Sequence, residues 1–92
     1  MIIAVPFHTF VIEGTQHNVY HVDLNTGLPK HEHIYAHATV CHAGKLKVTK
    51  ENFELIMDKT TQPVLLKENE WHELEALEDG TVFENIFKEG AY

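Results

Sequence analysis

The residues in this sequence best suited to chemistry are its histidines, of which there are eight in 92 residues. Three of them fall in the segment His31-Glu32-His33-Ile34-Tyr35-Ala36-His37, at spacings of two and four residues. Side chains at even spacing point to one face of a β-strand. A regular strand through this segment therefore projects the three imidazoles together and turns Glu32 away.

Three imidazoles on one face of a strand need partners for their ring nitrogens, because an unpaired buried polar group is costly. A divalent metal meets this need, since neutral imidazole binds Mn, Fe, Co, Ni, Cu and Zn. A single histidine in a strand is more often a surface or hydrogen-bonded core residue, and a His-x-His pair alone is weak evidence. The third histidine at this spacing favours a metal site.

The elements that must position these residues are short β-strands. Runs rich in β-branched and aromatic residues alternate with turn signals such as Asn25-Thr26-Gly27 and Asp79-Gly80, and no long helical pattern occurs. This pattern predicts an all-β sandwich or barrel. The predicted strands are 7–13, 18–24, 32–41, 44–49, 53–57, 63–66, 71–77 and 81–87.

The segment 71–77 admits two secondary structures. Trp71, Leu74 and Leu77 fall at helix-like spacing, and the segment contains good helix formers. As a strand, however, it places His72 and Leu74 on one face and its glutamates on the other. We therefore predict a strand.

The histidine segment resembles the first sequence motif of the cupin family, G-x5-H-x-H-x3/4-E-x6-G. Here Gly27 precedes His31-x-His33, His37 follows after three residues, and Gly44 follows after six more. The histidine spacing and the final glycine match the motif. Two departures occur: Gly27 precedes His31 by three residues instead of five, and His37 stands where the family has glutamate.

The second cupin motif, G-x5-P-x-G-x2-H-x3-N, is degraded in this chain. Lys67 stands at the proline, Asn69 at the second glycine, His72 at the histidine and Ala76 at the asparagine. Asn69 is a reasonable replacement for glycine, because asparagine tolerates a positive φ in a turn.

The resemblance covers about residues 18–87 and implies a cupin-type jelly-roll β-barrel of two antiparallel sheets. We expect one domain over residues 1–92, with residues 1–6 as an N-terminal arm or strand. In cupins the two motifs converge inside the barrel, which implies one centre for a divalent transition metal (Mn, Fe, Ni or Zn) formed by His31, His33, His37 and His72. An all-histidine set resembles the four-histidine single-domain cupins, which hold manganese or similar metals.

Four neutral ligands leave the full charge on a divalent ion, which favours Lewis acidity and an anionic oxygen ligand. An octahedral shell would keep two adjacent positions open, whereas a tetrahedral four-histidine zinc site would be closed and structural. Three functions follow: a metal-dependent, oxygenase-type enzyme acting on a small oxygenated metabolite, a non-catalytic metabolite-binding or sensing module, or a structural metal site. The sequence offers no clear general acid or base, so catalytic residues stay unassigned.

Other residues receive simpler interpretations. Tyr35 shares the predicted ligand face and, with Phe83 and Asn85 of the expected closing strand, is a candidate for lining the pocket. Cys41 is expected to be a small core residue. The remaining histidines are expected to lie away from the metal; they are His8, His17, His21 and His42.

Composition restricts the partners and the compartment. The formal net charge of −7 argues against binding to nucleic acid or to an anionic membrane. A single cysteine and no basic N-terminal region indicate a cytoplasmic protein. A small barrel leaves sheet edges exposed, and the apolar run Met1–Val5 is suited to pairing with a neighbouring subunit, so we expect a homodimer. Alternatively, this run is an ordinary strand of its own barrel.

Overall fold

The computed structural model describes residues 1–90, which form ten strands and no helix. No helix in this range is long and apolar enough to cross a membrane. The strands are β1 (Ile2–Ile3), β2 (His8–Ile12), β3 (Thr15–Val22), β4 (Thr26–His31), β5 (His37–Ala43), β6 (Leu46–Lys50), β7 (Phe53–Met57), β8 (Val64–Leu66), β9 (His72–Ala76) and β10 (Thr81–Lys88).

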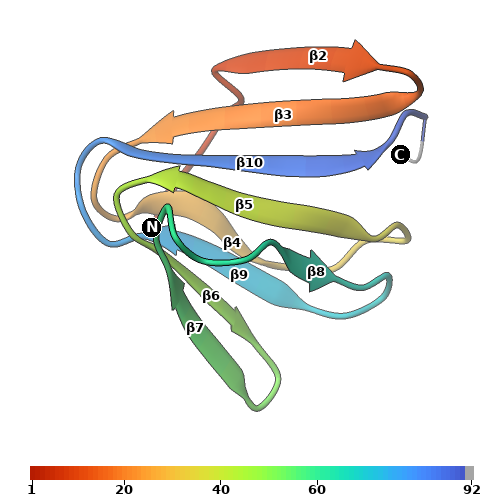
Figure 1. The fold of residues 1–92 in the computed structure, drawn as a ribbon. Helices are drawn as coiled ribbons and strands as arrows, with labels where there is room; N and C mark the ends of the chain where they lie inside the picture. The colour runs from red at the N-terminus through yellow and green to blue at the C-terminus, as the bar shows by residue number, and fades with distance from the viewer. Residues whose placement is uncertain (91–92) are drawn as a thin grey trace.

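The strands form two five-stranded sheets, in the orders β1-β4-β9-β6-β7 and β2-β3-β10-β5-β8. In Figure 1, β2, β3, β10 and β5 run across the front of the molecule, with β4 and β9 behind them. All pairs are antiparallel except β1 with β4, which is parallel. The predicted all-β jelly roll is confirmed.

The core lies between the sheets and follows the alternation of each strand. In β9 and β10 every second residue is buried, and the residues between them are half-buried or exposed. Phe83 stacks on Tyr20 at 4.6 Å between ring centroids and is fully buried. The core also contains polar side chains, because His37, Thr39, His72, Thr81 and Asn85 are buried with the apolar residues.

One predicted strand is wrong in its first half. Residues 32–36 form a connection between β4 and β5, and β5 begins only at His37. Strand β4 itself was missed, because Gly27 and Pro29 are both unfavourable in a strand interior. Pro29 lies in the part of β4 where the register with β9 shifts, between Leu28 and His31.

Two ambiguous segments are resolved as strands. His72–Ala76 forms β9, with His72, Leu74 and Ala76 buried as the strand alternation predicts. At the N-terminus, β1 pairs with β4 of the same chain, and hydrogen bonds from the Ile2 and Ala4 amides extend this contact. The homodimer stays a prediction.

Gly27 is required by the close approach of β4 and β9. A Cβ atom at this position would overlap the Leu74 carbonyl oxygen, which is backbone and cannot move aside easily. We predict that Gly27→Ala lowers the free energy of unfolding by about 3 kcal/mol, the upper range for overpacking. The measurement is urea denaturation.

Gly14→Ala is the control for this variant. Gly14 has a φ of +79°, and no heavy atom lies within 4 Å of the point that a Cβ atom would occupy, so only its backbone conformation resists the change. We expect a cost of about 1 kcal/mol there. Equal costs for the two variants would contradict the steric role of Gly27.

Candidate metal centre

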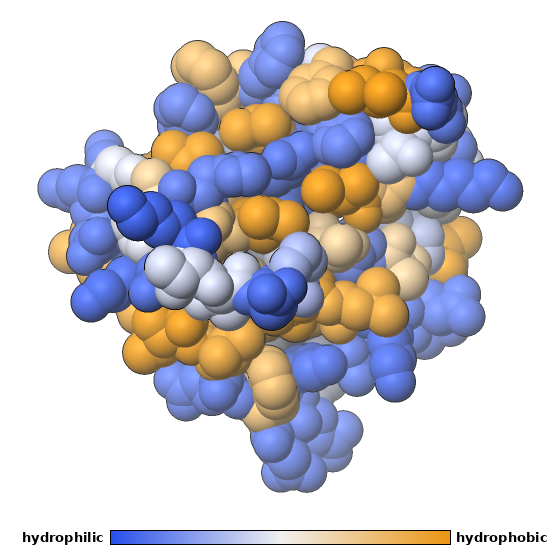
Figure 2. Space-filling model, viewed as in Figure 1, coloured by the Kyte–Doolittle hydropathy of each residue, from blue (hydrophilic) through white to orange (hydrophobic). Residues whose placement is uncertain are grey.

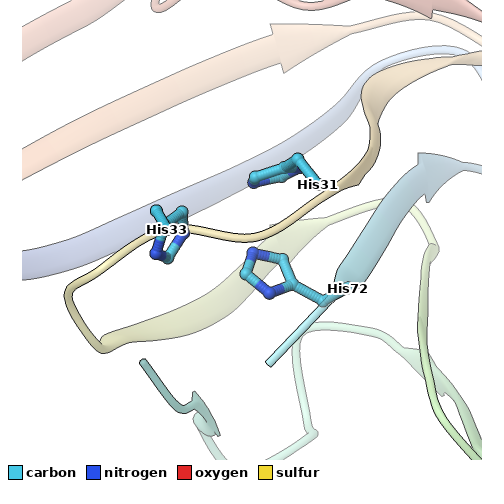
Figure 3. A group of neighbouring side chains, drawn as sticks. All are labelled: His31, His33 and His72. Atoms are coloured by element: carbon cyan, nitrogen blue, oxygen red, sulfur yellow. The ribbon is translucent and has the colours of Figure 1, made fainter. Parts of the chain in front are cut away.

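Three histidines meet where β4, β9 and the connection to β5 come together. His31 ends β4 and lies directly opposite His72, the first residue of β9, while His33 lies in the connection. One ligand nitrogen from each of these residues lies within 4.8 Å of the others. Figure 3 shows the three rings grouped around one space. This cluster is large enough and compact enough to bind a metal ion.

His37 adjoins this cluster through His72. Its Nε2 atom lies 3.3 Å from Nε2 of His72, and its ring centroid lies 5.1 Å from that of His33. His37 is the first residue of β5, and only 4% of its surface is exposed. The structure therefore brings all four predicted ligands into one neighbourhood, with His37 on its buried side.

The argument from strand parity that placed these residues together is wrong. His31 and His37 lie on strands of different sheets, and the connection between these strands turns back to place His33 between them. The connection is tied down by a hydrogen bond of 2.8 Å from the Asn69 amide to the His33 carbonyl. Asn69 has the positive φ, 57°, that was predicted for it.

Three of the four imidazoles are oriented by backbone carbonyls two residues away. Nδ1 of His31 lies 2.6 Å from the Pro29 oxygen, and Nδ1 of His33 lies 2.6 Å from the Tyr35 oxygen. Nδ1 of His72 lies 3.0 Å from the Glu70 oxygen. A carbonyl only accepts hydrogen bonds, so each Nδ1 carries the proton and each Nε2 has a free lone pair.

His37 is oriented by a short polar chain instead. The Thr39 hydroxyl donates to Oδ1 of Asn85 at 2.7 Å, so its oxygen accepts from Nδ1 of His37 at 3.2 Å. Nε2 of His37 is therefore also unprotonated. Asn85, a predicted pocket residue, acts here by fixing the direction of the Thr39 hydrogen bond.

This tautomer assignment implies that the contact between His37 and His72 is not a hydrogen bond. Two Nε2 lone pairs face each other at 3.3 Å, and neither has a proton to share. Such a pair is repulsive unless a cation lies beside both nitrogens. Two imidazoles bound to one ion at ordinary metal–nitrogen distances have their nitrogens about 3 Å apart. The donor set thus fits a divalent transition metal.

Burial favours the neutral form of three of these imidazoles, those of His33, His37 and His72. It lowers the pKa of His37 to about 3 and that of His72 to about 4, and repulsion from the neighbouring histidines acts in the same direction. Burial also lowers the pKa of His33. At neutral pH these imidazoles are in the form that binds metal.

The predicted pocket residues lie in different surroundings. Tyr35 is half-buried and stacks on His33, with 4.1 Å between ring centroids and 7° between planes, and it also contacts Phe87. Phe83 belongs to the core. No pocket is found among residues 1–90, so their role in lining one stays a prediction.

The other histidines lie away from this centre. His17 and His42 both contact Glu84, at 2.5 Å and 2.8 Å, on the face of β3, β10 and β5 that points away from the core. Burial opposes ionisation of Glu84, but hydrogen bonds from the two histidines outweigh it and lower its pKa. The sequence reasoning missed this cluster, because nothing local links residues 17, 42 and 84. His17 lies within β3, which begins three residues before the predicted strand 18–24.

Comparison with known proteins rests on structure alone. No protein-family model and no curated protein sequence matches the chain. Among solved structures, a cupin-2 domain-containing protein from Shewanella frigidimarina is 14% identical, with a TM-score of 0.72 over 91% of this chain and 82% of that one. The chain has the cupin fold.

Two further cupin structures agree. A cupin superfamily protein from Desulfitobacterium hafniense has a TM-score of 0.75 at 8% identity, covering 92% of this chain and 76% of that one. A cupin domain from Bordetella pertussis covers 97% of this chain and 96% of its own length, with a TM-score of 0.68 and 16% identity. At these identities the similarity establishes the cupin fold and leaves the function to be argued from the site.

We predict that the metal-free protein loses stability as the pH falls below about 6.5, the ordinary histidine pKa. The pKa values of His37 and His72 are lowered in the folded state, so the unfolded chain binds protons first. Each of these two histidines removes about 1 kcal/mol per pH unit until its own folded pKa is reached. Urea denaturation between pH 7.5 and 5 measures this loss. A flat profile for the parent, or the same slope in His37→Leu, would contradict the assignment.

Proposed function

We propose that this cupin binds one divalent transition metal through Nε2 of four histidines, His31, His33, His37 and His72. The observation that carries the proposal is the contact of two unprotonated Nε2 atoms at 3.3 Å, each fixed by a hydrogen bond at Nδ1. A bound metal would give a partner to the unprotonated Nε2 atoms of these four buried or half-buried imidazoles.

A divalent ion bound by four neutral donors keeps its full positive charge, although the chain as a whole has a net charge of −7. No described carboxylate belongs to the histidine cluster, so the charge of a bound ion is not neutralised by its ligands. A ligand with anionic oxygen atoms therefore suits the site. When bound, the metal supplies Lewis acidity and, if it is iron or manganese, redox chemistry with dioxygen.

We infer an oxygenase-type enzyme that acts on a small oxygenated metabolite. His31 and His33 are half-exposed whereas His37 and His72 are buried, so a ligand approaches from the side of the first two. Tyr35, stacked on His33, borders that approach and orients a ligand by contact with its ring. The buried side is closed by Thr39 and its hydrogen bond to Asn85.

The second candidate is a metabolite-binding cupin without turnover. It is favoured by the lack of a general acid or base: among the described residues, the polar groups in hydrogen-bond contact with the four imidazoles are backbone carbonyls and the Thr39 hydroxyl.

We also place the protein in the cytoplasm, because its one cysteine, Cys41, is free and buried.

One experiment separates the two candidates. The protein is loaded with Fe(II) or Mn(II), and dioxygen consumption is followed while small enolates, diols and hydroxy acids are added singly. The enzyme proposal expects consumption that depends on both metal and metabolite. Binding of a metabolite to the metal-loaded protein without dioxygen consumption supports the second candidate. X-ray absorption that shows a closed shell of four histidines without water would contradict both candidates.

We predict that His72→Ala weakens binding of Mn(II) or Zn(II) by about 100-fold or more, because it removes a ligand and leaves His37 without its partner. Isothermal titration calorimetry at pH 7.5 measures the change. His42→Ala is the matched control, since His42 contacts Glu84 on the opposite face of its sheet. Equal affinity of His72→Ala and the parent would refute the four-histidine assignment.

A further inference from the structure

A row of side chains crosses the inner face of the sheet that contains β9. His31 lies opposite His72, and His72 in turn lies opposite Lys50 of β6. Lys50 lies opposite Phe53 of β7. Residues directly opposite each other share a face of the sheet, and His72 is buried on the core side. Lys50 therefore lies on the same face as the histidine cluster, one strand away from His72.

This row marks the end of the apolar core. The neighbouring row of the same sheet is entirely apolar and consists of Leu28, Leu74, Val48 and Leu55. Lys50 ends β6 and Phe53 begins β7, so the two residues flank the turn of this hairpin. The hairpin lies at the bottom of Figure 1, and its tip is hydrophilic, in blue, in Figure 2. Lys50 thus lies where the core gives way to solvent, beside the candidate metal centre.

The Lys50 ammonium group is held beside this centre by Glu70. Its Nζ atom lies 3.3 Å from Oε1 of Glu70 and 5.0 Å from the centroid of the Phe53 ring. The main-chain carbonyl of the same glutamate accepts the hydrogen bond from Nδ1 of His72 at 3.0 Å. The Glu70 carboxylate therefore occupies a position near His72 that an anionic group of a ligand can take. Its side chain is 32% exposed, so a displaced carboxylate returns to water.

A structural ion pair is the simpler interpretation of Lys50 and Glu70. Lys47, on the same strand, forms such a pair with Glu75 at 3.4 Å, but on the outer face of the sheet. A partly exposed pair contributes little to stability, and this one keeps the Lys50 side chain, only 18% exposed, on the inner face. A positive charge is useful there, because the net charge of −7 otherwise repels an anionic ligand.

We propose that Lys50 binds a carboxylate of the ligand at the metal centre, and that this ligand is a small hydroxy dicarboxylate. The inference rests on the proposed metal centre and narrows its class of ligand. Adjacent strands are about 4.8 Å apart, so anionic oxygens beside His72 and a carboxylate at Lys50 can belong to one short molecule. The ligand carboxylate replaces that of Glu70, which makes Lys50 a specificity-determining residue with no part in bond making or breaking.

The test is isothermal titration calorimetry of the full, Zn(II)-loaded chain with two pairs of ligands. The members of each pair differ only in the distal carboxylate, which a methyl group replaces: malate with α-hydroxybutyrate, and the longer α-hydroxyglutarate with α-hydroxyvalerate. We expect the parent to bind at least one dicarboxylate about tenfold tighter than its partner, as one charged hydrogen bond provides. Lys50→Gln should lose this preference. Lys47→Gln, the matched control on the outer face, should keep it.

Glu70→Gln provides a test of opposite sign. It removes the competing carboxylate and leaves the main-chain acceptor of His72 in place. We expect the preferred dicarboxylate to bind about threefold tighter to this variant, because Lys50 is released from its ion pair. If Lys50→Gln is not folded by circular dichroism, this variant decides, and unchanged or weaker binding overturns the inference.

Three further results would overturn the inference. The first is a parent that binds zinc but prefers neither dicarboxylate. The second is a folded Lys50→Gln variant that keeps the preference, and the third is a Lys47→Gln variant that loses it equally. Titration of each metal-free protein with Zn(II) is a separate measurement. A parent that binds no zinc refutes the metal centre, and this inference with it, whereas zinc binding without a dicarboxylate preference refutes the role of Lys50 alone.

Discussion

The opposed Nε2 lone pairs of His37 and His72 are the constraint on which the centre of this protein depends. Nδ1 of His72 donates its proton to the Glu70 carbonyl, and Nδ1 of His37 donates to the Thr39 hydroxyl, whose own proton goes to Asn85. These bonds leave the two Nε2 atoms without protons at their 3.3 Å contact. A buried pair of this kind is unfavourable by itself. It becomes favourable when a cation is shared, so the same contact that weakens the metal-free fold defines the proposed metal centre.

This constraint also links the two sheets. His31 and His72 belong to the sheet of β4 and β9, whereas His37 belongs to the sheet of β5. An ion bound by all of them cross-links the sheets at one end of a domain whose core is small. Binding free energy at the site is then folding free energy as well, as expected by mass action. A metal bound at this site would therefore support the fold whether or not the protein is an enzyme.

The sequence predicted the architecture well, because most strands carry a clear alternation of buried and exposed residues. It failed at β4, where Gly27 and Pro29 obscure the strand, and the reasons are tertiary: Gly27 is needed by the backbone of Leu74, and Pro29 lies where the register shifts. The four histidines predicted from spacing and family resemblance do lie in one neighbourhood, yet the regular strand assumed for them is interrupted by a loop. Their role as metal ligands stays a prediction. The contact of His17 and His42 with Glu84 depends on strand pairing alone and had no signal in the sequence.

The local origin of the ring orientations has an evolutionary consequence. Three of the four histidines are held by main-chain carbonyls two positions away, and a carbonyl is present whatever side chain its residue carries. Point mutations at Tyr35 or Glu70 leave these carbonyl acceptors in place. Among the four acceptors of the Nδ1 protons, only the Thr39 hydroxyl belongs to a side chain and can be removed by a substitution. A centre built in this way survives extensive sequence drift, since selection has to preserve little more than the histidines and the path of the backbone.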